Sequence, residues 1–139
     1  MRTQVKIRKT TLTDFSNVAH ILKACHLSGP WFTRTLFRKL LKKNKGLYLV
    51  AEMQGKIIGS VFAMEDGGYY GYLYKLAVLP TYRRYGIATK LINSALQVLA
   101  KHGIDWTFAL VEKTNRASIK TLQSVGFKIR RTHYLIDKT

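Results

Sequence analysis

The sequence predicts an α/β protein with a central mixed, mostly antiparallel sheet flanked by about four helices. Short apolar segments with strand-like alternation recur along the chain, and four other segments carry the three- and four-residue spacing of amphipathic helices. Gly-containing turns separate these segments. The elements follow one another in the order β-α-α-β-β-β-α-β-α-β. At 139 residues, the chain is expected to form one domain over residues 1–139.

The first third of the chain predicts one strand and two helices. The strand lies near residues 5–8, where apolar and basic residues alternate. Thr13 or Asp14 can cap the first helix, and the segment 28–30, Ser-Gly-Pro, ends it. The second helix spans about residues 33–43 and carries basic residues on its outer face.

The rest of the chain predicts hairpins followed by two helix–strand units. Gly-containing turns at 54–55 and 65–68 separate strands that hairpins make antiparallel. Strands joined through a helix are expected to be parallel. The predicted strands span 47–53, 56–64, 69–78, 105–111 and 127–136, and the predicted helices span about 84–102 and 116–124.

The charge balance is strongly basic. The chain has 24 Lys and Arg against 7 Asp and Glu, a formal net charge of +17. This field attracts polyanions and repels polycations, although a merely solvated basic surface explains the same composition. Cys25 is the single cysteine, which excludes an internal disulfide and fits a reducing cytoplasm. We expect no metal site, no membrane span and no secretory signal.

The segment between Tyr72 and Leu91 predicts an anion site. It begins as a strand, turns at a proline and passes through a basic loop into an amphipathic helix. The first N–H groups of a helix lack partners, and the helix dipole places partial positive charge there. Gly86 permits close approach of a ligand, and Arg83 and Arg84 add charge beside it. The expected ligand is a phosphate or pyrophosphate.

Two motifs in this order resemble the Gcn5-related N-acetyltransferase (GNAT) superfamily. The phosphate loop of that family is similar to Val78-Leu79-Pro80 followed by Arg83-Arg84-Tyr85-Gly86-Ile87-Ala88. Its second motif is similar to Asn115, Ser118, Ile119, Leu122 and Gly126-Phe127. The resemblance covers nearly the whole chain and implies an acyl-CoA N-acyltransferase-like fold with acetyl-CoA (coenzyme A) as cofactor.

The resemblance also implies which residues hold the cofactor. The pantetheine arm would lie against the strand before the loop, in a gap opened by a bulge, and the pyrophosphate would take main-chain N–H groups of the loop. An amide-rich arm can add to a splayed strand as an extra strand does. The implied cofactor-binding residues are Leu76, Ala77, Val78, Arg83, Arg84, Tyr85, Gly86, Ile87, Ala88, Thr89, Asn115 and Ser118.

The chain departs from the family at its acid and base positions. Leu122 stands where many members have a tyrosine acid, and Tyr72 and Leu110 stand where members carry a base. The remaining candidates for the catalytic base, directly or through water, are Tyr72, Glu112 and His133. Each also has a plain structural interpretation, as sheet packing, local charge balance and surface exposure respectively. Trp31, like Tyr72, is a candidate for the substrate wall.

These observations favour a single acetyltransferase domain that moves an acetyl group to a primary amine. The acceptor is a protein N-terminal α-amine or a small amine, attacked directly in a ternary complex. The alternative is a catalytically weak module with this fold that binds RNA or ribosomes through its basic surface. An anionic or ribosome-associated partner fits either interpretation, and a second subunit is expected to cover the last edge of the sheet.

Overall fold

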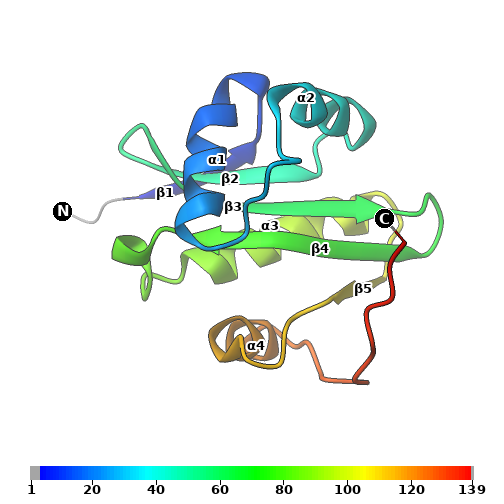
Figure 1. The fold of residues 1–139 in the computed structure, drawn as a ribbon. Helices are drawn as coiled ribbons and strands as arrows, with labels where there is room; N and C mark the ends of the chain where they lie inside the picture. The colour runs from blue at the N-terminus through cyan, green and yellow to red at the C-terminus, as the bar shows by residue number, and fades with distance from the viewer. Residues whose placement is uncertain (1–3, 139) are drawn as a thin grey trace.

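Four helices flank a five-stranded sheet in the computed structural model, which describes residues 4–138 (Figure 1). This arrangement confirms the predicted α/β fold class. The strands are β1 (Val5–Lys9), β2 (Tyr48–Met53), β3 (Lys56–Glu65), β4 (Tyr70–Val78) and β5 (Trp106–Ala109). The α-helices are α1 (Phe15–Ala24), α2 (Arg34–Lys43), α3 (Ile87–Lys101) and α4 (Arg116–Ser124), and short 3-10 turns cover Leu12–Asp14 and Pro80–Tyr82.

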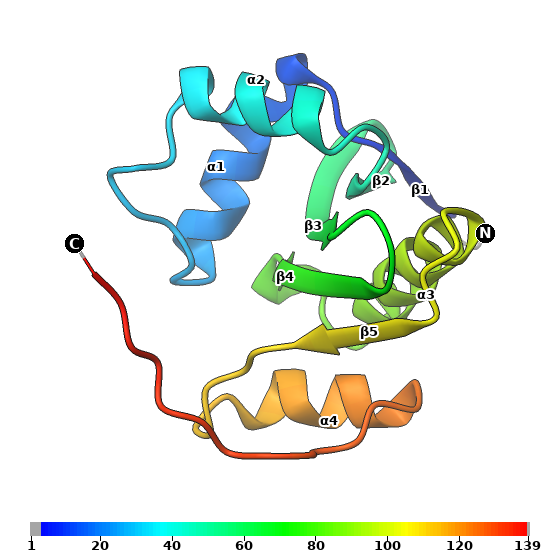
Figure 2. The same cartoon turned by 90° about the vertical axis from the view of Figure 1, so that its right-hand side faces the viewer.

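The strands lie in the sheet in chain order, from β1 to β5. The first four are antiparallel, as hairpin connections require, whereas β4 and β5 are parallel because α3 joins them. The sheet is therefore mixed and mostly antiparallel, as predicted. Figure 2 shows α1 and α2 over one face of the sheet and α3 over the other, with α4 beyond β5.

The core between the sheet and the first two helices is aromatic. Phe37 of α2 is completely buried and packs against Phe15, Phe32 and Phe62 with ring centroids 5.5–6.2 Å apart. Full burial of such a side chain contributes about 1.5–3 kcal/mol. This cluster fixes α1, α2 and the loop between them on β3.

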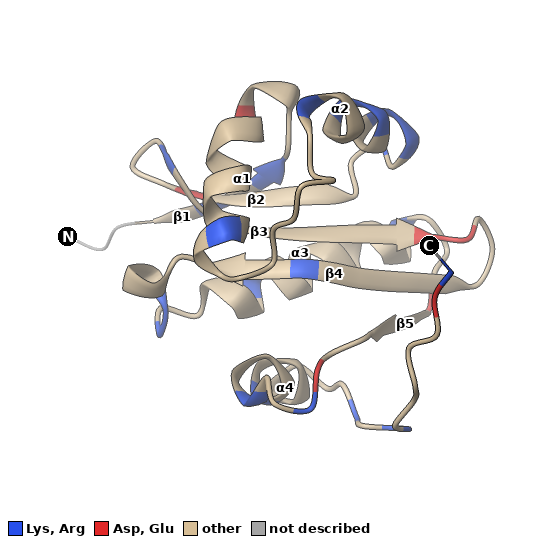
Figure 3. Ribbon diagram, in the orientation of Figure 1, with Lys and Arg blue, Asp and Glu red and all other residues tan. Residues whose placement is uncertain are grey.

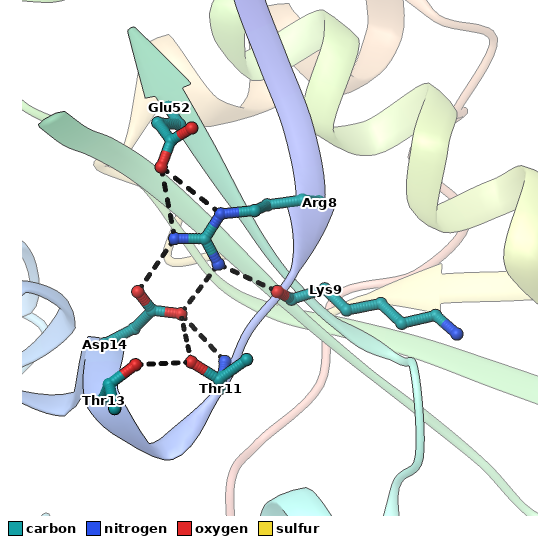
Figure 4. Close-up of polar contacts among 6 residues, drawn as sticks. All are labelled: Arg8, Lys9, Thr11, Thr13, Asp14 and Glu52. Atoms are coloured by element: carbon teal, nitrogen blue, oxygen red, sulfur yellow. Dashed lines mark hydrogen bonds and ion pairs between the residues drawn. The ribbon is translucent and has the colours of Figure 1, made fainter. Parts of the chain in front are cut away.

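A polar network ties the edge strand β1 to β2 and to the start of α1 (Figure 4). Arg8 makes two 2.9 Å hydrogen bonds to the carboxylate of Asp14 and lies 3.4 Å from Glu52. Asp14 is buried, and it also accepts a 2.8 Å hydrogen bond from the Thr11 amide. The guanidinium donation lowers the pKa of the Asp14 carboxyl below its usual value.

The predicted strand at 127–136 is wrong. Residues 128–138 follow α4 as an exposed segment without regular structure. Their pattern explains this, because Arg130 and Arg131 adjoin and Tyr134, Leu135 and Ile136 are consecutive, so neither stretch alternates between faces. Nor does the segment pair with β5, which is bonded to β4.

The two C-terminal helices differ in how well the sequence predicts their ends. Helix α4 matches the predicted bounds, and the Asn115 side chain caps it by accepting a 3.2 Å bond from the Ser118 amide. Helix α3 begins at Ile87, three residues later than predicted, because Arg84 and Gly86 both have left-handed backbone angles.

Within residues 4–138, β5 has no strand on its outer side. An edge strand of this kind offers unpaired main-chain groups to another chain. The second subunit expected at this edge therefore stays a prediction. Light scattering at micromolar concentration is expected to give the mass of a dimer, and a monomer mass contradicts it.

Candidate active site

The loop before α3 presents main-chain amides with no partner. Arg84 and Gly86 have φ values of 74° and 72°, which turn the chain sharply into Ile87, the first residue of α3. The first amides of a helix have no acceptor within it, and within residues 4–138 no turn or cap bond is donated by residues 84–89. A Cβ added at Gly86 meets no atom within 4 Å, so the protein leaves the space beside this glycine open.

Arg83 has a different position from the rest of the loop. Its Nε donates a 3.2 Å hydrogen bond to the Val78 carbonyl, and its Nη2 lies 3.6 Å from the Cys25 sulfur. The guanidinium therefore fastens the loop to the end of β4 and to the end of α1. Arg84 and Tyr85 are exposed at the tip of the loop.

A bulge divides β4 into two halves. Phe62 of β3 pairs with Tyr74 and Ser60 pairs with Ala77, so β4 carries two residues opposite one at this point. Lys75 lies in the bulge with a φ of 51°. Beyond the bulge, Ala77 and Val78 pair again with Ser60 and Gly59 of β3, and Leu76, Ala77 and Val78 are the predicted cofactor contacts of this strand.

Strands β4 and β5 separate at the same place. Their pairing ends at Leu73 and Ala109, although β4 continues to Val78. From Tyr74 onward, the side of β4 that faces away from β3 has no strand partner within the described residues. The two strands diverge toward their carboxyl ends in Figure 1, and the 3-10 turn Pro80–Tyr82 connects β4 to the loop before α3.

Aromatic rings cover the face of β4 and β5 that lies toward α1. Tyr72 stacks between Tyr74 and Phe108 with centroid distances of 5.3 and 5.0 Å. Burial raises the pKa of the Tyr72 hydroxyl, so this phenol stays protonated at neutral pH. Tyr72 can therefore donate a hydrogen bond at the site but is a poor proton acceptor in its neutral form.

The loop between α1 and α2 borders the bulge. Trp31 is half-exposed, and its ring lies 4.6 Å from the Nζ of Lys75. Lys75 Nζ also donates a 2.9 Å hydrogen bond to the Leu27 carbonyl in the same loop. The predicted substrate residues Trp31 and Tyr72 thus lie on one side of the sheet, near the divergence of β4 and β5.

The other two candidate bases lie at the rim. His133 lines a shallow hollow together with Tyr70, Trp106, Phe108 and Leu110. Phe108 therefore borders both His133 and Tyr72. Glu112 is exposed in the loop between β5 and α4, close in sequence to Asn115. Leu122, at the position of the family tyrosine, is buried in the core.

Four of the seven acidic residues already make polar contacts within the protein. Asp14 and Glu52 pair with Arg8, Glu65 pairs with His102, and Asp66 accepts three turn amides. Figure 3 shows basic residues on most elements and only scattered acidic ones. Residues 4–138 contain no group of three or more His, Cys, Asp or Glu placed to hold a metal ion. Over the same residues, every helix is too short or too polar to span a bilayer.

The arrangement can hold a long, amide-rich anion in an extended form. Free amides at the start of α3 suit a pyrophosphate, and the unpaired side of β4 suits an amide-bearing arm. The open space at Gly86 leaves room for the phosphate oxygens. The residues present therefore fit coenzyme A.

Comparisons with known proteins agree with this geometry. Residues 15–127 match the model of the acetyltransferase (GNAT) family. An acetyltransferase of Sodalis glossinidius is 30% identical over 135 residues, which cover 96% of this chain and 94% of that one. One of Pectobacterium atrosepticum is 31% identical over 125 residues, covering 89% and 88%.

Solved structures give the same fold at lower identity. The aminoglycoside N-acetyltransferase AAC(6')-Iy in complex with CoA has a TM-score of 0.84 at 20% identity, covering 99% of this chain and 97% of that one. Ard1 from Thermoplasma volcanium has a TM-score of 0.82 at 19% identity, covering 91% and 84%.

Fold and site together define an acetyl-CoA-dependent N-acetyltransferase. More specifically, the chain belongs to the GNAT acetyltransferase family. The resemblance in the two sequence motifs is thereby confirmed, as is the cofactor, acetyl-CoA. Lys75 and the direction of the Arg83 side chain were not predicted, although a single lysine inside the apolar strand 70–78 is a visible signal.

Proposed function

We propose that this enzyme acetylates a weakly basic primary amine, the α-amine of a protein N-terminus or of a small molecule. The acceptor attacks directly in a ternary complex without an acyl-enzyme. The observation that carries the proposal is the row of unpartnered amides at residues 84–89 beside the divergence of β4 and β5. Acetyl-CoA supplies an activated carbonyl and a thiolate that leaves readily, since thiols have a pKa of about 8.5.

A weakly basic acceptor follows from the proton that must be lost before attack. An amine with a pKa of about 10.4 is only about 0.1% neutral at pH 7.4, whereas an α-amine near 7.8 is about 30% neutral. The family positions for a base carry Tyr72 and Leu110, neither of which takes up a proton at neutral pH. The site therefore suits an acceptor that loses its proton without strong assistance.

The chain's own residues have separate roles in this proposal. Amides of residues 84–89 hold the pyrophosphate, Arg83 fixes the loop on Val78, and residues 76–78 align the pantetheine arm. Asn115 caps α4 with its side-chain oxygen, which leaves its amide N–H groups for the cofactor. A main-chain N–H near Val78 polarises the thioester oxygen. Tyr72 donates a hydrogen bond at the reacting centre, and His133 or Glu112 relays the proton through water.

Acetyl transfer tests the proposal most directly. Purified protein is incubated with radiolabelled acetyl-CoA and a panel of peptides, amino acids and small amines. Labelled N-acetyl product with release of free thiol supports the proposal. Binding of acetyl-CoA without transfer to any amine contradicts it, and salt-sensitive binding of RNA by the same sample then favours the RNA-binding alternative.

Replacement of Tyr72 by phenylalanine isolates the hydroxyl. The ring contacts with Tyr74 and Phe108 remain, so the melting temperature and the affinity for coenzyme A are expected to stay unchanged. The value of kcat is expected to fall about 10- to 100-fold, which is less than the loss of a full general acid or base would cause, because Tyr72 donates a hydrogen bond and does not transfer a proton. Tyr70→Phe, on the same strand face, is the matched control and should keep full activity. An unchanged kcat in Tyr72→Phe means that Tyr72 only packs.

His133 and Glu112 are distinguished by a similar pair of variants. His133→Gln and Glu112→Gln each keep a polar side chain and remove the proton acceptor. We expect one of the two variants to lower kcat by about tenfold or more. Full activity of both variants at every pH contradicts a role for either residue.

A further inference from the structure

The bulge in β4 turns a basic side chain toward the acceptor side of the site. Side chains normally alternate along a strand, so Lys75 would point away from the face that carries Tyr74. Both residues instead face the side of α1. Tyr74 contacts Phe62 there, and Lys75 contacts Leu27 and Trp31 of the loop between α1 and α2. Lys75 thus lies where the loop between α1 and α2 meets β4, the strand proposed to align the cofactor.

This lysine is partly buried and lacks an acidic partner. The ion pairs of residues 4–138 involve Arg8 and His102, and none involves Lys75. Desolvation by burial lowers the pKa of its ammonium group. An ammonium has three N–H donors, and Leu27 accepts only one of them. Two donors therefore remain for a ligand.

The position of the lysine is fixed from the other side by Trp31. A Cβ added at Gly29 would lie 2.3 Å from the Trp31 indole nitrogen, so the indole packs directly on this glycine. The Trp31 ring face lies 4.6 Å from Lys75 Nζ and holds it by a cation–π contact. Trp31 is 49% exposed, so the ring and the partly buried ammonium remain accessible to a ligand.

We propose that Lys75 binds an anionic group of the acceptor, so that the enzyme prefers amines with a carboxylate close to the nitrogen, such as free α-amino acids. This inference rests on the proposed acetyl transfer and narrows its acceptor class. A neighbouring carboxylate raises the pKa of an α-amine. Pairing of that carboxylate with Lys75 opposes this rise, because the nearby Lys75 ammonium disfavours a second positive charge on the acceptor. Polyamines and aminoglycosides, which are polycations, are disfavoured for the same reason.

The experiment compares acceptors that differ only in charge. Initial rates with acetyl-CoA are measured for the common α-amino acids and for the matching amino acid amides, which keep the same amine and side chain. The wild-type enzyme is expected to show a value of kcat/KM at least about tenfold higher for the best amino acid than for its amide. The amide has the less basic amine, so an enzyme without charge recognition would prefer the amide.

Three variants assign the preference to Lys75. Lys75→Met keeps a long apolar stem against Trp31 and should raise KM for the amino acid about tenfold while leaving KM for the amide within twofold. Lys75→Arg should restore most of the preference. Lys56→Met is the matched control. Lys56 Nζ also lies over an aromatic ring, 5.5 Å from the centroid of Tyr82, and the substitution removes the same charge from the protein.

A binding measurement gives a second readout that needs no turnover. In the presence of coenzyme A, the N-acetyl amino acid should raise the melting temperature of the wild type more than its amide does, and Lys75→Met should lose this difference. Acetylation of amides and amino acids with equal efficiency, or an unchanged preference in Lys75→Met, overturns this inference alone. Absence of transfer to every amine overturns the proposed function together with it.

Discussion

Replacement of Gly86 by valine is expected to weaken coenzyme A binding by about tenfold or more. Gly86 has a φ of 72°, where a β-branched residue is strained by about 1–2 kcal/mol. A Cβ at this position meets no atom within 4 Å, so we expect the effect to arise from the backbone and not from a clash in the protein. Relaxation of the loop would misalign the amides of residues 84–89. Calorimetric titration with coenzyme A measures the loss.

Gly103→Val is the matched control for this variant. Gly103 follows α3 with a φ of 82°, and a Cβ there also meets nothing within 4 Å. Both variants should therefore lose comparable stability, but only Gly86→Val should lose affinity. Equal affinity in the two variants, or wild-type affinity in Gly86→Val, places the cofactor phosphates elsewhere.

Replacement of Arg8 by methionine is expected to lower the free energy of unfolding by about 2–3 kcal/mol. The change leaves the buried Asp14 carboxylate without its guanidinium partner, and removal of one member of a buried pair is strongly destabilising. The figure stays below the full range for a buried pair because Arg8 is partly exposed. Denaturant unfolding measures the loss, and Lys6→Met, an exposed neighbour on β1, should change stability by less than about 0.5 kcal/mol.

The same pair predicts a pH dependence with a definite sign. The pKa of Asp14 is lowered in the folded protein, first by the hydrogen bonds from Arg8, so the unfolded chain binds this proton more readily. The stabilisation is present above the unfolded pKa of about 4 and is lost as the pH falls through the lower folded value. Between pH 5 and about pH 3, the free energy of unfolding of Asp14→Asn should therefore fall less than that of the wild type. Parallel loss in both proteins contradicts this origin.

Local signals explain what the sequence predicted well. Helix α4 was predicted to its ends because Asn115 caps it and Gly126 follows it, and both signals act within a few residues. The α3 start was placed too early because Arg84 adopts a left-handed backbone that only glycine usually signals. The strand predicted at 127–136 does not form, because residues 130–136 do not alternate between faces and, within residues 4–138, no strand pairs with them.

The site shows the same division between local and long-range information. The phosphate loop was predictable because its glycine, its basic residues and its following helix are contiguous. Lys75 was not, because its role depends on a bulge relative to β3 and on a contact with Trp31, 44 positions earlier in the numbering. The direction of the Arg83 side chain likewise depends on Val78 and on Cys25 of the distant α1.

The bulge has a consequence for how this enzyme can change during evolution. It sets residues 70–74 and 76–78 in opposite phase, so the side chains of the two halves alternate independently. Under the proposal above, the first half faces the acceptor and the second half aligns coenzyme A. Substitutions at residues 70–74 would then change the acceptor preference without moving residues 76–78. A single-residue deletion at the bulge would instead turn the side chains of one half to the opposite face, so we expect the length of β4 to be more tightly constrained than its sequence.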